Sequence, residues 1–296
     1  SNSIFSSDGF LTTDALINPG YTRDNGKQNP KWNTWGWGYT GSPGTKSWMP
    51  STFSKTFYDG IKLTDNGRGK AVYYQFPTTP TNQLGFEGVS VVSSPEGTFW
   101  FPSTSRVGTS AGNSIGVLKG PDAGLPLITA SESYFIQAEA ALYGIISSIT
   151  AQAAFDNGIN HSFNYLYSLP NKTLVGNPSA LAATYKVDNV SSHLVNFNLA
   201  LTTEQKLEAI ITQKWIALNM VNCDQSWNDY RRTLYPKLNN AAGATKYETF
   251  ASLKSESTRP DKLPTRILYP SSEGTYNPTN VPKGLSPFTS LIFWAK

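Results

Sequence analysis

The sequence predicts a mainly helical fold, built of helix hairpins with long loops and a few short β-hairpins. Between residues 129 and 235, apolar residues recur at steps of three and four, the period of helices that bury one face. Between residues 1 and 128 this period is scarce, and Gly, Pro and Asn interrupt the chain at short intervals. We therefore expect one structural unit with a loop-rich region, residues 1–128, and a helical region, residues 129–296.

The composition favours a surface that meets neutral polar molecules. Charged residues make up 15% of the 296-residue chain, below the roughly 25% of an average soluble protein, whereas 13% are aromatic. The formal charge of +4 comes from scattered Lys and Arg, so nucleic acid is not an expected partner. The single cysteine, Cys223, offers no Cys/His cluster for zinc and is expected to be a small buried group near a helix end.

Two short β-hairpins are predicted in the loop-rich region. Asn66-Gly67, a dipeptide typical of tight hairpin turns, lies between the segments IKLTD and KAVYYQF. The second hairpin would pair FEGVSVVSS with GTFWFP across a Pro-Glu-Gly turn. Because long loops gain little from packing among themselves, we expect this region to drape over helices.

Aromatic residues concentrate in the segment NPKWNTWGWGYTGSPGTKSW, residues 29–48. Aromatic faces can stack on the C–H faces of a sugar while neighbouring amides and hydroxyls bond its alcohols. This pattern predicts a glycan-binding surface. The alternative is that these rings form the core of the loop-rich region, since each tryptophan can bury roughly 150–250 Å². The predicted ligand-binding residues are Trp32, Asn33, Trp35, Trp37, Tyr39 and Trp48.

A helix hairpin opens the helical region. Residues 132–146 and 150–169 each carry an apolar stripe, and a short Ser-Ser turn separates them. Thr129 and Glu132 form a capping box for the first helix. Glu139 lies near the stripe, where we predict that it pairs with an arginine. The residues expected to face inward are Tyr134, Phe135, Ala138, Ala141, Leu142, Ile145, Ala154, Ile159, Phe163 and Leu166.

Residues 202–235 predict a second pair of helices. A Thr-x-x-Gln capping box at residues 202–205 begins the first of them, and a turn near residues 222–224 separates it from the second. Asp229, with Arg231 or Arg232, is expected to tie the helices together through charge-assisted hydrogen bonds.

The rest of the chain predicts irregular structure. Residues 171–199 read as a loop with one short helix. Residues 259–296 contain repeated prolines, so we expect a tail that wraps the surface. Phe288, Phe293 and Trp294 would anchor it.

Catalytic motifs are absent from the sequence. Neither histidine is matched by a Gly-x-Ser-x-Gly serine, and no phosphate-binding or dinucleotide-binding pattern is present. Glycoside hydrolysis needs two opposed carboxylates, for which Asp224 with Asp229 or Glu132 with Glu139 could be proposed. Helix capping and ion pairing explain these residues adequately, so we predict no catalytic residue, no cofactor and no metal.

Several motifs, in a fixed order, resemble one protein family. Residues 213–218 read Gln-Lys-Trp-x-Ala-Leu, and residues 227–233 read Trp-x-Asp-x-Arg-Arg-Thr. They are preceded by YFIQAEAALYG from Tyr134 and AAFDNGINHSF from Ala153, and followed by LPTRILYPSSEGTYNPTN from Leu263. This order resembles the C-terminal part of the SusD/RagB family, surface-exposed nutrient-binding lipoproteins of the Gram-negative outer membrane.

The resemblance implies a SusD-like fold of tetratricopeptide-type helix hairpins. It also implies a non-catalytic chain that binds an oligosaccharide and caps a SusC-like TonB-dependent transporter. We further expect the chain to lack the N-terminal helical half and the lipid anchor that would attach it to the outer membrane. A peptide-binding member of the family is the main alternative, and a carbohydrate-active hydrolase is a more distant one.

Overall fold

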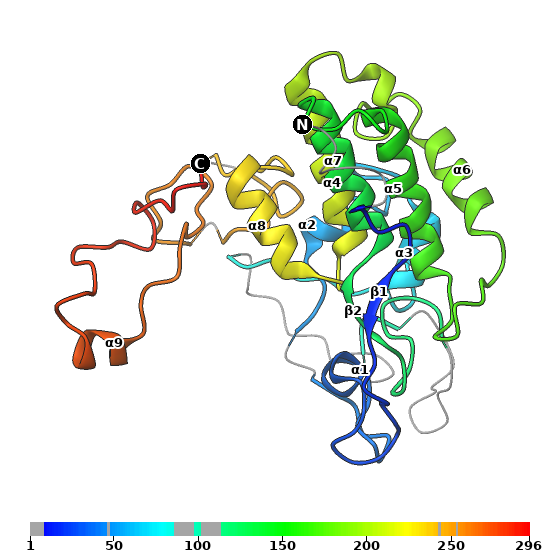
Figure 1. The fold of residues 1–296 in the computed structure, drawn as a ribbon, viewed down its shortest axis with the longest axis horizontal. Coiled ribbons are helices and arrows are strands. Elements are labelled where there is room, and N and C mark those ends of the chain that lie inside the picture. The colour runs from blue at the N-terminus through cyan, green and yellow to red at the C-terminus, as the bar shows by residue number, and fades with distance from the viewer. Residues whose placement is uncertain (1–8, 46–47, 86–97, 102–113, 242–243, 253) are drawn as a thin grey trace.

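The computed structural model describes residues 9–45, 48–85, 98–101, 114–241, 244–252 and 254–296 (Figure 1). Within these residues the fold is mainly helical, with one two-stranded sheet, as predicted. The elements in chain order are β1 (Ala15–Ile17), α1 (Pro30–Trp35), α2 (Thr52–Lys55), α3 (Asn66–Val72), β2 (Leu125–Ile128), α4 (Ala130–Leu142), α5 (Ala151–Leu166), α6 (Pro178–Asp188), the 3-10 helix η4 (Phe197–Leu199), α7 (Thr203–Leu218), α8 (Cys223–Thr233) and α9 (Ser271–Tyr276).

Helices α4, α5 and α7 form the centre of the molecule, with α6 beside α5 and α8 beside α7 (Figure 1). The hairpin of α4 and α5 is confirmed, and the Thr129 side chain accepts from the backbone N–H of Glu132 at 3.1 Å. The capping box of Thr202 and Gln205 at the start of α7 is also present. The predicted inward position of Ile145 is wrong, because α4 ends at Leu142 and leaves Ile145 half exposed.

One buried cluster contains side chains from both regions. The loop-rich region supplies mainly large aromatic rings, whereas α4, α5 and α7 add aliphatic and small residues as well as the rings of Phe135, Phe155 and Phe163. Both sets therefore share one core. Fully buried members include Trp32, Trp37, Phe53, Tyr73, Phe135, Phe155, Ile159, Phe163, Ile210 and Ile211.

The predicted hairpin at Asn66-Gly67 is wrong, because these residues begin helix α3. The Asp65 side chain caps that helix by accepting from the backbone N–H of Arg68 at 2.9 Å. Tyr73 and Tyr74, which should have faced opposite sides of a strand, are both buried. The second predicted hairpin lies mostly outside the described residues, and its described part, residues 98–101, is buried without forming a strand.

The sheet joins the two ends of the loop-rich region. Strand β1 pairs antiparallel with β2, with Ala15 opposite Ile128 and Ile17 opposite Leu125. The strands are separated by more than a hundred residues, so no short turn sequence links them and marks their pairing. Because β2 runs directly into the cap of α4, the pairing fixes the start of the loop-rich region to the start of the helical region.

The tail does not wrap the surface as predicted. The backbone N–H groups of Thr265 and Arg266 both donate to the carbonyl oxygen of Pro287, at 2.7 and 3.3 Å. Residues 266–286, the closed loop, therefore leave and return at one point, and Figure 1 shows them extending away from the helices with α9 near the tip. Phe293 is fully exposed and anchors nothing, whereas Trp294 lies over the Arg231 guanidinium at 4.7 Å.

Candidate ligand-binding surface

Helix α1 is fixed to both regions of the molecule. Asn29 caps it by accepting from the Trp32 backbone N–H at 3.1 Å, and the Asn29 amide donates to the carbonyl oxygen of Ala123 at 2.8 Å. The Lys31 ammonium donates to the carbonyl oxygens of Met220 and Val221, both at 2.7 Å, just beyond the end of α7. Burial lowers the pKa of Lys31 to about 8. The segment that follows α1 therefore starts from a rigid base.

Trp32 and Trp37 belong to the core and not to a ligand site, which corrects their prediction. Each is 1% exposed, and their ring centroids lie 5.2 Å apart. Phe101 packs edge-on against both rings, at 6.2 Å from Trp32 and 4.9 Å from Trp37. Since both indoles are enclosed by other rings, neither offers a face to a ligand.

Trp35 and Trp48 form an aromatic pair at the surface. Trp48 is 63% exposed, and its ring centroid lies 5.9 Å from that of the half-buried Trp35, at an interplanar angle of 72°. On its other side, Trp35 meets the buried ring of Trp100 at 5.3 Å. The exposed ring is thus connected to the core through two further indoles.

A tight turn brings the two halves of this segment together. The backbone N–H of Thr45 donates to the carbonyl oxygen of Thr34, and that of Gly44 to Gly36, both at 2.7 Å. A Cβ at Gly44 would lie 2.5 Å from the Thr34 carbonyl oxygen, so only glycine permits this approach. The turn therefore directs the chain back along α1 toward Trp48.

The other two predicted residues, Asn33 and Tyr39, are exposed on the same segment. Tyr39 is 53% exposed, and among the described residues no ring pair includes it. The structure therefore separates the predicted set into a core pair and a remainder. We call this remainder, Asn33, Trp35, Tyr39 and Trp48, the aromatic surface.

Three of the four carboxylates considered for hydrolysis, those of Glu132, Glu139 and Asp229, are held in ion pairs between helices, whereas Asp224 is exposed. The Lys214 ammonium lies 2.8 Å from Asp229 and 4.0 Å from Glu132, joining α7 to α8 and α4. Arg232 donates to both oxygens of Glu139, one at 2.8 Å, and to Asp229 at 3.0 Å. The predicted pairing of Glu139 with an arginine is thus confirmed, as is that of Asp229 with Arg232.

The pKa directions agree with this structural role. Burial raises the pKa of Glu132, and the nearby Lys214 acts against that rise. Partial burial alone would lower the pKa of Arg232, but Glu139 and Asp229 raise it. Arg231 instead donates to the carbonyl oxygen of Thr265 at 3.2 Å, so it holds the base of the closed loop.

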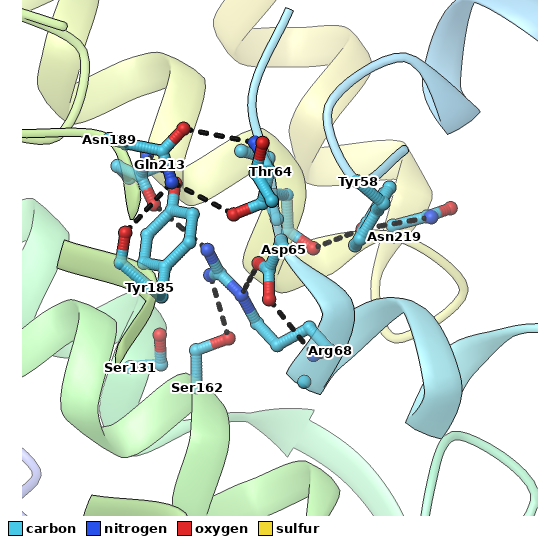
Figure 2. Close-up of polar contacts among 12 residues, drawn as sticks. Tyr58, Thr64, Asp65, Arg68, Ser131, Ser162, Tyr185, Asn189, Gln213 and Asn219 are labelled. Carbon is cyan, nitrogen blue, oxygen red and sulfur yellow. Dashed lines mark hydrogen bonds and ion pairs between the residues drawn. The ribbon is translucent and has the colours of Figure 1, made fainter. Parts of the chain in front are cut away.

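A further ion pair, which the sequence did not predict, joins Arg68 to Asp65 and is fully buried (Figure 2). Arg68 is completely buried and donates to Asp65 at 2.5 Å, to Ser162 at 3.3 Å and to Gln213 at 3.2 Å. The Gln213 amide in turn donates to the Tyr185 hydroxyl at 2.7 Å. The contacts link α3 to α5, α6 and α7, and burial raises the pKa of Asp65 while Arg68 opposes the rise.

The same network fixes the segment that precedes α3. Asn189 accepts from the Thr64 backbone N–H at 2.9 Å and donates to the Thr64 carbonyl oxygen at 2.8 Å, as a neighbouring strand would (Figure 2). Asn219 donates to the hydroxyls of Tyr58 and Tyr73, at 3.1 and 2.8 Å. These polar groups hold the two regions in register.

Cys223 is exposed at the first turn of α8, which corrects the prediction that it is buried. Across the described part of the chain, no group of three or more His, Cys, Asp or Glu side chains could hold a metal ion. In the same residues, no helix has the length and apolar character needed to cross a membrane.

Comparison with known protein families identifies the chain. A family model described as Susd and RagB outer membrane lipoprotein matches residues 112–289, more than half of the sequence. The chain belongs to the SusD-like family. This confirms the resemblance seen in its motifs, and the match begins before the helical region, within the loop-rich region. No curated protein matches the SusD-like chain.

Solved structures share the SusD-like fold. A SusD homologue from Bacteroides fragilis NCTC 9343 superposes with a TM-score of 0.58 and 20% identity, covering 95% of this chain and 56% of that one. An outer membrane protein from Bacteroides vulgatus ATCC 8482 gives a TM-score of 0.54 and 18% identity, covering 94% and 56%. A chitin-binding SusD homologue from Flavobacterium johnsoniae is 30% identical, but its TM-score is 0.38 and the match covers 52% and 32%. The chain therefore spans little more than half, or less, of the length of these relatives.

Proposed function

We propose that this SusD-like chain binds an oligosaccharide on the aromatic surface and delivers it, uncleaved, to a SusC-like TonB-dependent transporter at the outer membrane. The main supporting observation is the exposed Trp48 ring braced by Trp35, whose centroid is 5.9 Å away. A flat indole can cover the C–H face of a sugar, and the neighbouring Asn33 amide and Tyr39 hydroxyl can bond its alcohols. No cofactor is needed for such binding.

The rigid attachment of the aromatic surface supports this assignment. Trp35 is wedged between Trp48 and Trp100, and α1 is attached to residues beyond α7 through Lys31. A surface fixed before the ligand arrives loses little side-chain entropy when the ligand binds. The aromatic surface therefore has a stable shape into which successive sugar rings can settle.

Binding without cleavage is supported by the ion pairs. A glycosidase needs one protonated and one ionised carboxyl group facing across the scissile bond. Glu132, Glu139 and Asp229 instead contact Lys214 or Arg232 at helix interfaces. These carboxylates stabilise the fold by joining α4, α7 and α8.

The proposal is tested by titrating the chain with neutral oligosaccharides while tryptophan fluorescence is recorded. Fragments of α-glucan, β-glucan, xylan, mannan and chitin serve as probes, with neutral peptides in parallel. We expect Trp48→Ala to weaken glycan binding at least ten-fold, about 1.4 kcal/mol, without changing the unfolding transition. Tyr276→Ala, at an exposed ring of the closed loop, is the matched control and should bind as the unmodified chain does.

Three results would contradict the proposal. Binding of peptides alone would point to a peptide carrier, and release of shortened sugars would identify a hydrolase. Equal affinities of the Trp48→Ala and Tyr276→Ala variants would show that the glycan binds elsewhere.

A further inference from the structure

A separate pocket lies between β1, the start of α4 and the C-terminal half of α5. It encloses about 200 Å³, and the residues that define its chemistry are Asp14, Leu16, Lys119, His161, Asn164 and Lys172. We propose that this pocket binds a single neutral sugar ring. The site shares no residue with the aromatic surface and is a second binding site, independent of the proposed function.

The walls of the pocket are held by helix ends. Asp14 accepts from the backbone N–H of Ala130 at 2.9 Å, which fixes the residue before β1 to the first turn of α4. On the opposite side, Lys119 donates to the carbonyl oxygen of Tyr165 at 2.6 Å and also to that of Ser168, at the end of α5. Both contacts satisfy backbone groups that a helix leaves unpaired, so they are strong attachments. The pocket is thus a built cavity between fixed elements.

Two polar side chains of α5 are available to a ligand. His161 and Asn164 both line the pocket, and within the described residues no hydrogen bond uses either side chain. The imidazole of His161 is oriented by the Tyr134 ring, whose centroid lies 4.9 Å away. Burial lowers the pKa of His161, so at neutral pH the ring offers one donor and one acceptor.

The charges that face the pocket nearly cancel. Asp14 is opposed by Lys172 and by Lys119, whose pKa is lowered by burial to about 7 and whose side chain already donates to two carbonyl oxygens. A neutral ligand that both donates and accepts hydrogen bonds satisfies all of the remaining groups. Sugar hydroxyls do both, and the amide of Asn164 can bond two neighbouring hydroxyls at once.

The apolar lining and the size favour one sugar ring. Leu16, Pro170 and Leu174 provide surface for its C–H face. A volume of about 200 Å³ corresponds to roughly six or seven water molecules at about 30 Å³ each, comparable to a six-membered sugar ring. A longer chain would have to leave through the mouth, so only its terminal residue could occupy the pocket.

The test uses the full chain and four probes, glucose, galactose, mannose and N-acetylglucosamine, followed by saturation-transfer NMR. We expect at least one of these to bind and to shift the His161 ring resonances. Leu16→Trp, which fills the pocket from β1, should reduce the affinity at least ten-fold, and Asn164→Ala at least five-fold. Leu201→Trp, an equal change at a residue 83% exposed outside the pocket, should have no effect.

Folding of each variant is followed by circular dichroism. If Leu16→Trp does not fold, the sugar affinity of Asn164→Ala tests whether the pocket is the binding site. The proposal is overturned if none of the four sugars binds, or if a folded Leu16→Trp or Asn164→Ala variant binds as well as the unmodified chain. Trp48→Ala separates the two sites. If it abolishes monosaccharide binding while the pocket variants do not, the sugar occupies the aromatic surface, which would support the proposed function and refute the pocket.

Discussion

The two regions of the molecule achieve order by different means. Helices α4, α5, α6 and α7 each begin at a Thr or Asn side chain that caps the first turn, whereas α8 has no side-chain cap. These helices contribute aliphatic and small residues as well as aromatic rings to the core. In its described residues the loop-rich region has only short helices and the two strands β1 and β2, and it contributes mainly packed aromatic rings to the shared core. It remains in place because its charged side chains bind the ends of the helices.

The described part of the chain contains three such attachments. Asp14 binds the N-terminus of α4, Lys119 binds carbonyl groups at the end of α5, and Lys31 binds carbonyl groups beyond α7. The first and last turns of a helix have unpaired backbone groups that attract charges of the matching sign. A region with little secondary structure can thus be ordered by satisfying the unpaired backbone groups at the ends of neighbouring helices.

The largest expected effect comes from separating the regions at their buried ion pair. Asp65→Ala removes the cap of α3 and leaves Arg68 buried without its partner. We expect the free energy of unfolding to fall by about 4–6 kcal/mol, the sum of an uncompensated buried charge and a lost cap. Urea denaturation measures this change. The control is Asp24→Ala, at an exposed pair with Lys27 at 4.0 Å, which should cost less than about 0.5 kcal/mol.

A smaller effect is expected when the aromatic core of the loop-rich region is damaged. Trp37→Ala should reduce the free energy of unfolding by about 3–5 kcal/mol, because the removed indole leaves a cavity beside Trp32 and Phe101. Hydrogen exchange should show the amides of Gly44 and Thr45 opening before those of α5. If α5 loses protection at the same time, the two regions form one cooperative unit and the distinction between them fails.

The attachment of Lys119 predicts a pH dependence. Burial lowers the pKa of Lys119 to about 7, so the folded chain releases this proton at a lower pH than the unfolded chain does. The unfolded state then binds more protons, and the free energy of unfolding should rise with pH between about 7 and 9.5. Relative to Lys119→Met, the unmodified chain should gain about 3 kcal/mol across this window, at about 1.4 kcal/mol per pH unit.

Urea midpoints at pH 6.5, 8 and 9.5 measure that gain. The window ends below the range in which buried tyrosines begin to ionise, and Lys31 contributes equally to both proteins. Parallel curves for the two proteins would show that Lys119 is not desolvated where it meets α5.

The smallest expected effect concerns the helical region alone. Glu139→Gln weakens the partly exposed pair with Arg232 and should cost about 1 kcal/mol, since Arg232 keeps Asp229. Asp156→Asn changes a more exposed pair, with Lys186 at 2.6 Å, and should cost less than about 0.5 kcal/mol. Denaturant melts of both variants compare them. A larger loss in Asp156→Asn would mean that burial does not determine the strength of these pairs.

Sequence reasoning succeeded where the determinants are local. The predicted caps at Thr129 and Thr202 lie within three residues of the groups they bind, and helical period identified the buried face of α5. The pairing of Glu139 with an arginine was also predictable, because a carboxylate beside an apolar stripe needs a partner. These features make the helical region largely readable from the sequence.

The loop-rich region was less predictable because distant residues decide its structure. Asn66-Gly67 is typical of a hairpin, but the Asp65 cap and the contacts of Arg68 with α5 and α7 favour a helix there. Trp32 and Trp35 lie three residues apart on α1, and Phe101 covers only the first. Composition therefore located the aromatic segment, residues 29–48, whereas packing decided which of its tryptophans are buried and which are exposed. The pocket had no sequence signal, since its walls come from widely separated segments.

The closed loop has a practical consequence. Its ends meet at the Pro287 carbonyl oxygen, and Arg231 donates a hydrogen bond to the carbonyl oxygen of Thr265, just before the loop begins. The structure of the rest of the molecule consequently does not depend on the length of the closed loop. Doubling that length would raise the entropic cost of closing the loop by only about 0.6 kcal/mol. Gly274, around which a Cβ would meet nothing within 4 Å, is thus a suitable place to insert a fluorophore tag or an affinity handle.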